Sequence, residues 1–320
     1  MLHLAIKYLL IAASALASTV TFAQAYPSQP IRFIVSQGPG GLSDLFARLV
    51  ASKLSAAVGQ PVIVDNRAGA DGVIGTDLAA KAAPDGYTIL LTSSGPLAIL
   101  PSLGMTLPYD PNRDFQAISF LGYSTFGLFV NPALPVANVQ EFIALAKSKP
   151  GQLNYGAGGA VVRIGTEMFS SAANIRMVYV PYKSNPPAVT DLIGGQIQAM
   201  FLPLVAAPQA KTGHIKLLAV HSPKRLPHLP DTPTLIESGV TGLDFTVWAG
   251  VHGPAGIPQD RVQRLNMEFA KILKLPDVIE AARVMGFEAQ SSTPEELDAR
   301  VKAEQVAYPK VIRQIGMTTQ

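Results

Sequence analysis

The sequence predicts an α/β protein of two domains. Its 320 residues are enough for two domains of ordinary size. Short apolar segments that read as strands alternate with helical patterns, which favours mainly parallel sheets covered on both faces. Two glycine-rich loops, at 37–44 and 156–163, each follow such a strand. We therefore expect two α/β units, with crossings between them near residues 126 and 247.

The first 25 residues are predicted to be a secretory signal peptide. Lys7 precedes a continuous apolar run at 8–17, which is too short for a membrane span with an anchoring flank. The Ala-x-Ala pattern at 23–25 predicts cleavage after Ala25, with a cut after Ala17 as the alternative. The mature protein would then begin at Tyr26.

Composition excludes several classes of function. The chain has no cysteine, which excludes a lipid-modified N-terminus, disulfides and thiolate chemistry. Its formal charge of +3 falls to +2 without Lys7, and no basic patch with interleaved aromatic residues is present, so we expect no nucleic-acid partner. The five histidines show no metal-ligand spacing, and neither a metal nor a cofactor is expected.

The first domain is predicted to comprise residues 26–125 and 247–320. Its expected strands cover 31–35, 61–64, 87–91 and 118–122, and its expected helices cover 44–58 and 72–83. Residues 258–273 and 276–284 are expected to be helical. Thr293 and Glu296 form a capping box, with Pro294 at the first helical position, and predict a last helix.

The second domain is predicted to comprise residues 126–246. Expected strands cover 126–130, 153–155, 177–180, 199–202 and 217–220, and expected helices cover 139–147, 164–171 and a segment from 186 to about 194. Asn138 is the expected N-cap of the helix at 139–147, and Pro150 with Gly151 ends it.

The first glycine-rich loop suggests an anion site. Gln37, Gly38, Gly40 and Gly41 lie between a strand and a helix, where glycine lets backbone N–H groups approach a ligand and the helix N-terminus adds partial positive charge. Asp44, in the first helical turn, has two interpretations: a cap, with Ser43 as a competing N-cap, or a contact to ligand or water.

Two more loops leave strands in the same way. One contains Gly158 and Gly159, and the other contains Ser93 and Ser94. Ligands of open α/β sheets lie beyond the carboxyl ends of the strands, so two facing domains would direct all three loops into one cleft. The sequence thus predicts a ligand clamp.

Ordered segments along the mature chain carry a family resemblance. They are Tyr26-Pro27, Pro30-Ile31-Arg32, Pro39-Gly40-Gly41, Gly59-Gln60-Pro61-Val62, Asn66-Arg67, Pro84-Asp85-Gly86-Tyr87-Thr88, Leu107-Pro108-Tyr109-Asp110, Val180-Pro181-Tyr182-Lys183, Gly194-Gly195-Gln196, Pro230-Asp231-Thr232-Pro233-Thr234 and Trp248-Ala249-Gly250. Together they resemble the Bug-type periplasmic receptors of tripartite tricarboxylate transporters over essentially the whole mature chain.

That resemblance implies a type II periplasmic binding protein: a two-lobed Venus flytrap with two crossings between the lobes. It implies capture of a small organic acid, whose carboxylate reaches backbone N–H groups of the two glycine-rich loops, and delivery to integral membrane transporter subunits. Ser93 and Ser94 would contribute from the third loop, and Tyr182 and Lys183 would lie near the cleft. We expect a periplasmic monomer with no catalytic residue.

Departures from the family pattern concern ligand choice. Ser36-Gln37 stands where the family usually has Pro-Phe, and Arg163 stands where the family's second loop ends in histidine. A guanidinium pairs with carboxylate in bidentate fashion, so Arg163 is a candidate second anchor, or else a solvated residue at a helix start. Tyr155, Tyr182 and Trp248 are compatible with an aromatic acid or with core packing.

Two other functions remain open. A flytrap can report its ligand to a membrane sensor instead of a transporter, since both use closure on the ligand. A periplasmic hydrolase would need Ser93 or Ser94 as nucleophile with a base nearby, and the sequence has no Gly-x-Ser-x-Gly elbow.

Overall fold

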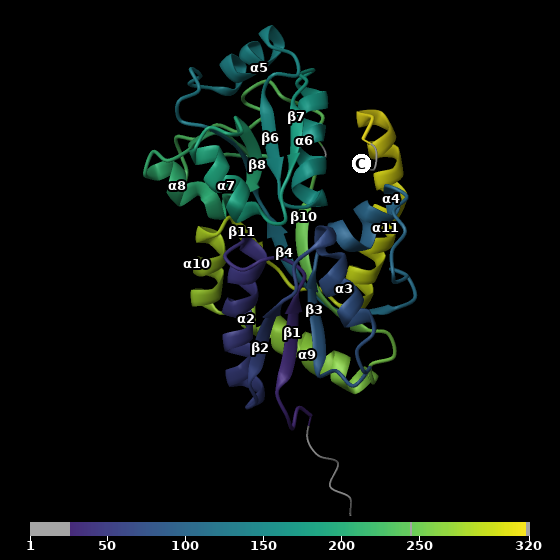
Figure 1. Ribbon diagram of the computed structural model, residues 1–320. Coiled ribbons are helices and arrows are strands. Elements are labelled where there is room, and N and C mark those ends of the chain that lie inside the picture. The colour runs from purple at the N-terminus through teal and green to yellow at the C-terminus, as the bar shows by residue number, and fades with distance from the viewer. Residues whose placement is uncertain (1–25, 244, 318–320) are drawn as a thin grey trace, which may run out of the picture.

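The computed structural model describes residues 26–243 and 245–317, and it contains two sheets that form the centres of two lobes (Figure 1). The predicted signal peptide lies outside the described residues. One sheet has six strands in the order β11-β4-β10-β3-β1-β2, and the other has five in the order β7-β6-β8-β5-β9. The predicted two-lobed α/β fold is therefore confirmed.

The six-stranded sheet consists of β1 (Ile31–Val35), β2 (Val62–Asn66), β3 (Thr88–Thr92), β4 (Phe115–Ser124), β10 (Val247–Pro254) and β11 (Phe287–Ala289). The helices that follow its strands are α2 (Leu42–Val58), η1 (Ala70–Gly72), α3 (Val73–Ala80), η2 (Gly95–Ile99), α4 (Leu100–Ser102), α9 (Gln259–Ile272), α10 (Pro276–Val284) and α11 (Pro294–Ile315).

The five-stranded sheet consists of β5 (Phe126–Val130), β6 (Asn154–Ala157), β7 (Val178–Pro181), β8 (Ala199–Pro203) and β9 (Lys216–His221). Its helices are α5 (Val139–Ser148), α6 (Ala160–Ala172), α7 (Asn185–Ile193), η3 (Leu204–Ala206) and α8 (Ala207–Lys211). Across the described residues, none of the helices is both long and apolar enough to cross a bilayer.

The chain passes between the two sheets twice, and this sets the strand directions. β4 ends at Ser124 in one sheet and β5 begins at Phe126 in the other, and the chain returns to enter β10 at Val247. A strand that enters a lobe from the hinge runs opposite to strands that end there. Accordingly β10 is antiparallel to β3 and β4, and β5 is antiparallel to β8 and β9. The expected mainly parallel sheets are mixed for this reason.

Apolar spacing and caps explain the individual helices. In α2 the side chains of Phe46, Val50 and Leu54 recur at helical spacing and are buried, and Gly59 ends the helix at φ 71°, in the left-handed region. Asn138 accepts a hydrogen bond from the backbone N–H of Glu141 at 2.8 Å, which confirms the predicted cap of α5. The predicted capping box at the start of α11 is also present.

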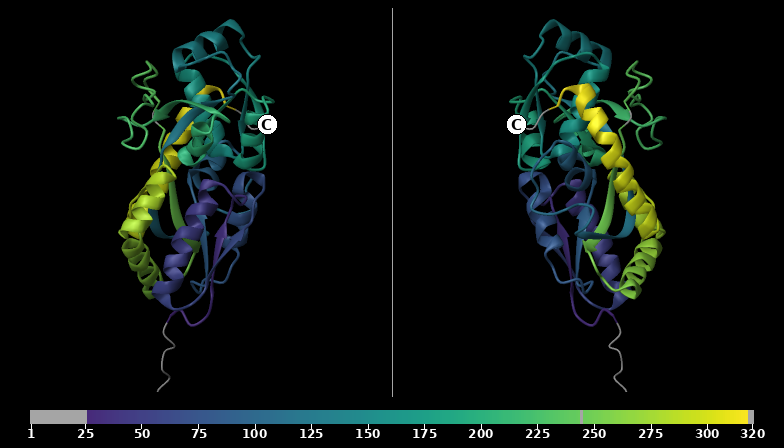
Figure 2. Two further views of the ribbon diagram at one scale, coloured as in Figure 1. Left: turned by 90° about the vertical axis from the view of Figure 1, so that its left-hand side faces the viewer. Right: turned by 90° about the vertical axis from the view of Figure 1, so that its right-hand side faces the viewer.

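Helix α11 contacts both lobes (Figure 2). Its first turns bury Leu297 and Val301 beside Trp248 of β10. Its last turns bury Tyr308 and Ile312 in the core of the five-stranded lobe, against α6. Residues 247–320, which include this helix, were predicted to belong to the first domain alone. Helical periodicity identifies the buried face of a helix but not which lobe covers that face.

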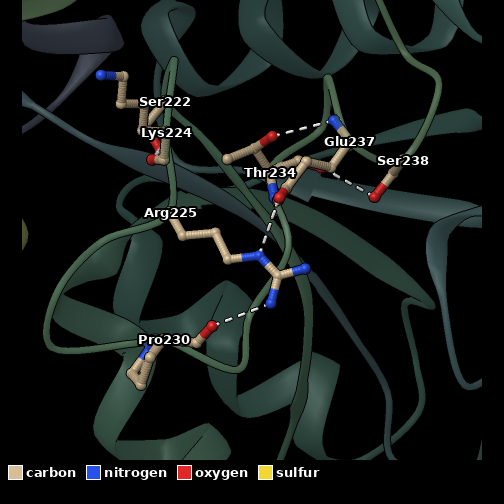
Figure 3. Close-up of polar contacts among 7 residues, drawn as sticks. All are labelled: Ser222, Lys224, Arg225, Pro230, Thr234, Glu237 and Ser238. Carbon is tan, nitrogen blue, oxygen red and sulfur yellow. Dashed lines mark hydrogen bonds and ion pairs between the residues drawn. The ribbon is translucent and has the colours of Figure 1, made fainter.

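Residues 222–243 and 245–246, between β9 and β10, form no helix or strand and lie beside the five-stranded lobe in Figure 2. Polar contacts fix their course (Figure 3). The Arg225 Nε lies 3.0 Å from both carboxylate oxygens of Glu237, and its Nη1 donates to the carbonyl of Pro230 at 3.0 Å. The backbone N–H of Thr234 donates to Glu237 at 2.8 Å.

Candidate functional site

The carboxyl ends of β1, β3, β6 and β7 lead to the space between the lobes. Helices α3, α6 and α7 begin there, after Gly72, Gly159 and Ser184. None of these three N-termini is capped by a side-chain hydrogen bond. The first backbone N–H groups of α6 and the positive ends of the helix dipoles favour an anion in this space. Helix α7 offers few donors because residues 186 and 187 are prolines, and the Val73 N–H at the start of α3 donates to the Ala70 carbonyl.

A small polar cavity of about 30 Å³ lies where these loops meet. Its lining includes five residues predicted from the sequence: Gln37, Ser93, Gly158, Gly159 and Lys183. The remaining lining residues are Ser36, Asp71, Gly72, Gly95, Pro96, Ala160, Val161, Val162 and Asn185. Loops from both lobes thus form one cavity, with the exposed side chain of Lys183 as its single cation among the described lining residues.

A second cavity of about 60 Å³ adjoins the first on the hinge side. The two share Gln37, Ser93, Val161, Val162 and Asn185. The rest of the second lining is mainly apolar: Leu42, Ser43, Phe46, Leu91, Ser124, Phe126, Pro203, Val247, Trp248, Ala249 and Phe287. We call the two the polar cavity and the apolar cavity.

Asp44 holds the first glycine-rich loop together. It is 3% exposed, accepts a hydrogen bond from the backbone N–H of Gly40 at 2.9 Å, and pairs with Arg48 at 2.9 Å. Burial by itself would raise the pKa of this carboxyl, but Arg48 and the Gly40 N–H outweigh it and lower the pKa. Ser43 is not the N-cap, since its hydroxyl donates to Gln37 Oε1 at 2.6 Å.

Glycine is required at the tightest point of the second loop. A Cβ on Gly158 would lie 2.0 Å from the carbonyl carbon of Ser184, at the start of α7. The Gly158 N–H donates to Asn185 Oδ1 at 3.0 Å, which ties the loop to that helix. Gly38 approaches the same segment from the other lobe, with Ser184 Cβ 3.2 Å from the position of a Cβ.

Seven of the sequence candidates do not line the polar cavity. Gly38, Gly40, Gly41 and Asp44 belong to the framework of the first loop, and Ser94 is a buried residue preceding η2. Tyr182 donates its hydroxyl to Asp191 Oδ2 at 2.6 Å, and burial with the Asp191 charge raises its pKa to about 12. Arg163 is the seventh.

Arg163 lies on α6 and lines neither the polar cavity nor the apolar cavity. Its Cζ is 4.6 Å from the centre of the Tyr179 ring, a cation–π contact within the five-stranded lobe. Burial raises the pKa of Asp71, which belongs to the other lobe, and the positive charge of Arg163 partly offsets that rise. The two charged groups therefore interact electrostatically across the cleft. The structure therefore places Arg163 beside an aromatic ring and an opposing carboxylate.

Sequence reasoning missed Asp71 and Asn185. Asp71 has a φ of 55° within a run of positive φ values from 69 to 72, an arrangement uncommon for residues other than glycine. The Gly69-Ala70-Asp71-Gly72 segment after a strand was a detectable turn signal. Asn185 precedes two prolines at the first position of α7, where it was detectable only as part of a helix start.

The residues described as lining the two cavities include Ser93 but no histidine that could act as its base. No cluster of metal-ligating side chains occurs within residues 26–243 and 245–317. The larger hollows lie elsewhere: one of about 530 Å³ runs along α11, and one of about 690 Å³ borders the segment 222–246.

The chain is similar to known proteins in sequence. The family model described as tripartite tricarboxylate transporter family receptor matches residues 46–317. Protein BugT of Bordetella pertussis is 35% identical over 317 residues, covering 98% of this chain and 97% of that protein.

Two solved structures with ligands are also similar. Rpa4515 of R. palustris with adipate has a TM-score of 0.88 and 32% identity, covering 91% of this chain and 98% of the other. MatC from Rhodopseudomonas palustris with bound malate has a TM-score of 0.84 and 27% identity, covering 90% and 100%.

Proposed function

The chain belongs to the receptor family of tripartite tricarboxylate transporters, and from this premise we propose that it captures a small organic acid in the polar cavity between its lobes. The observation that carries the proposal is a cavity between the lobes that contains the uncapped N-terminus of α6 and one cation, Lys183. A carboxylate there would accept hydrogen bonds from backbone N–H groups and pair with the ammonium.

The site residues divide by role in this proposal. Gln37, Ser93 and Asn185 offer polar side chains, and Gly159 offers backbone without a neighbour within 4 Å of a Cβ position, whereas the Gly158 N–H is already bonded to Asn185. The other sequence candidates act indirectly: Asp44 fixes the first loop, and Tyr182 fixes the start of α7 through Asp191. The ligand touches both lobes and so favours the closed arrangement, which membrane subunits would recognise.

The similar proteins with adipate and malate support the ligand class. We also propose that the protein is exported after cleavage behind Ala25, acts in the periplasm as a monomer and catalyses no reaction. Mass measurement of the N-terminus after export checks the cleavage, and light scattering of the mature chain checks the monomeric state.

A thermal-shift screen of the mature protein, Tyr26 to Gln320, against mono-, di- and tricarboxylates tests the binding proposal. A ligand that binds only the folded form raises the melting temperature by mass action. We expect a shift with at least one acid and a smaller shift in Lys183→Met, whereas the surface control Lys302→Met should match the wild type. A panel without any shift would overturn the proposal.

Transport and sensing predict different partners for the same closed receptor. Family membership favours transporter subunits, and reconstituted subunits should transport the acid only when the receptor is present. Stable binding of the loaded receptor to a membrane sensor kinase, without such transport, would favour the sensing alternative.

A further inference from the structure

The two adjoining cavities suggest a more specific ligand than an organic acid in general. We propose that the ligand of this chain is a monocarboxylic acid with a short apolar tail, its carboxylate in the polar cavity and its tail in the apolar cavity. This inference rests on the proposed function, since it assigns the carboxylate to the same site.

The shared lining of the two cavities is the first step of the argument. Gln37, Ser93 and Asn185 border both, so a molecule held by its carboxylate in the polar cavity would reach the apolar cavity by passing these side chains. There it meets Phe46, Trp248 and Phe287. Trp248 and Phe287 are almost fully buried, and the Phe46 and Phe287 ring centres are 4.1 Å apart. A methylene chain in that space removes apolar surface from water on both sides.

Charge supplies the second step. Lys183 and Asp71 are the charged residues that line the polar cavity, and the described lining of the apolar cavity contains none. A second carboxylate at the far end of the ligand would lose its water without gaining a cation. Arg163, the candidate second anchor, lines neither cavity and lies over Tyr179. Among the described lining residues Lys183 is therefore the one cation, and it can pair with one ligand carboxylate.

The far end of the apolar cavity contains one polar atom that lacks a hydrogen-bond partner among the described residues, the hydroxyl oxygen of Ser124 at the hinge. A hydroxyl can share a hydrogen bond with a neutral group but cannot neutralise a carboxylate. The apolar space of about 60 Å³ is smaller than the roughly 150 Å³ cavity that holds a benzene ring. At the described lobe spacing it fits a tail of a few carbons.

Matched acids test the inference directly. Pentanoate and glutarate have the same chain length, and so do butanoate and succinate, but each pair differs in a methyl group against a carboxylate at the far end. Calorimetric titration of the mature wild-type protein should give dissociation constants at least tenfold lower for the monocarboxylate of each pair. Acetate, which fills only the polar cavity, should bind more weakly than pentanoate.

A cavity-filling variant provides a second readout. Ala249 lines the apolar cavity, and Ala249→Leu would occupy part of the space for the tail. We expect it to weaken pentanoate binding at least tenfold while acetate affinity changes less than threefold. Ala56→Leu, at an exposed position of α2, adds the same atoms away from the cavities and should bind both acids as the wild type does. Circular dichroism checks that each variant is folded.

The outcomes separate this inference from the proposed function. If glutarate and succinate bind as tightly as their monocarboxylate partners, or more tightly, the ligand class is wrong and the receptor proposal stands. If no acid binds, acetate included, the proposed function itself fails. Equal loss of acetate and pentanoate affinity in folded Ala249→Leu would also contradict the assignment of the tail to the apolar cavity.

Discussion

The carboxyl group of Glu304 should make the stability of this protein fall as pH rises. Glu304 lies on α11, where its Oε1 accepts a hydrogen bond from the Trp248 indole at 2.6 Å. Burial raises the pKa of Glu304 to about 7, whereas the Ser94 hydroxyl, the Trp248 indole and the Arg300 charge oppose that rise. The perturbation that isolates the effect is Glu304→Gln, which keeps an oxygen for the indole and removes the titration.

The sign and size follow from the pKa in the two states. The unfolded chain releases the Glu304 proton near pH 4.5 and the folded chain near pH 7, so the stabilisation is complete below 4.5 and is lost as pH rises through 7. At about 1.4 kcal/mol for each tenfold change in an ionisation equilibrium, the total loss is about 3 kcal/mol. Between pH 5 and pH 8 about 2 to 3 kcal/mol of it should be observed, because some is already lost at pH 5.

Urea unfolding of wild type and Glu304→Gln at pH 5 and pH 8 measures this. Relative to the wild type, the free energy of unfolding of the variant should rise by about 2 to 3 kcal/mol between pH 5 and pH 8. His252, whose pKa burial lowers to about 4, titrates alike in both proteins and cancels in the difference. Glu295→Gln, at an exposed position of the same helix, should show no such gain. A stability difference between Glu304→Gln and wild type that stays constant with pH would refute the reasoning.

Three further changes probe the loops and caps. Asp44→Ala should lower the free energy of unfolding by about 2 kcal/mol at pH 7, because the Gly40 N–H and Arg48 lose their buried partner; a loss below about 0.5 kcal/mol in urea unfolding would contradict this role. Gly158→Ala should lower the melting temperature by more than about 5 °C, since its Cβ would lie 2.0 Å from the carbonyl carbon of Ser184. The control Gly194→Ala, where the nearest atom to the new Cβ lies at 3.5 Å, should change the melting temperature by less than about 2 °C. Equal changes in the two variants would show that the backbone near Ser184 moves away from the new Cβ. Thr293→Ala should lower the free energy of unfolding by about 1 kcal/mol through loss of the capping box. Thr212→Ala, at an exposed position, should lower the free energy of unfolding by less. A larger loss in Thr212→Ala than in Thr293→Ala would be inconsistent with a cap at Thr293.

Much of the fold could be predicted from local patterns. The strands at 31–35 and 126–130 are short apolar runs bounded by turn residues, and the caps at Asn138 and Thr293 are local side-chain features. Strand β11 was missed because its three residues, Phe287–Ala289, are too few to show a period. The direction of β10 depends on its path across the hinge, which no local pattern contains.

The parts of the candidate site that are formed by backbone atoms could be predicted from the sequence. Glycine is needed at position 158 by close approach, and the loops at the carboxyl ends of strands follow from α/β topology. Lys183 followed from the resemblance. The positions of Arg163 and Asp71 could not be predicted, because they depend on how two lobes face each other. Asp44 could be either a cap or a contact until its partners Gly40 and Arg48 were located.

The order of strands has a consequence for how the chain folds after synthesis. All strands of the five-stranded sheet come from one continuous segment, 126–221, whereas the six-stranded sheet has β10, from residues 247–254, between β3 and β4. Pairing β10 with β4 closes a loop of about 120 residues, and such long closures are slow because the entropy cost precedes the contacts. The strands of the five-stranded sheet can therefore pair early, whereas the six-stranded sheet forms only after β10 and β11 are made, and the core of the five-stranded lobe is completed last, by Tyr308 and Ile312 of α11.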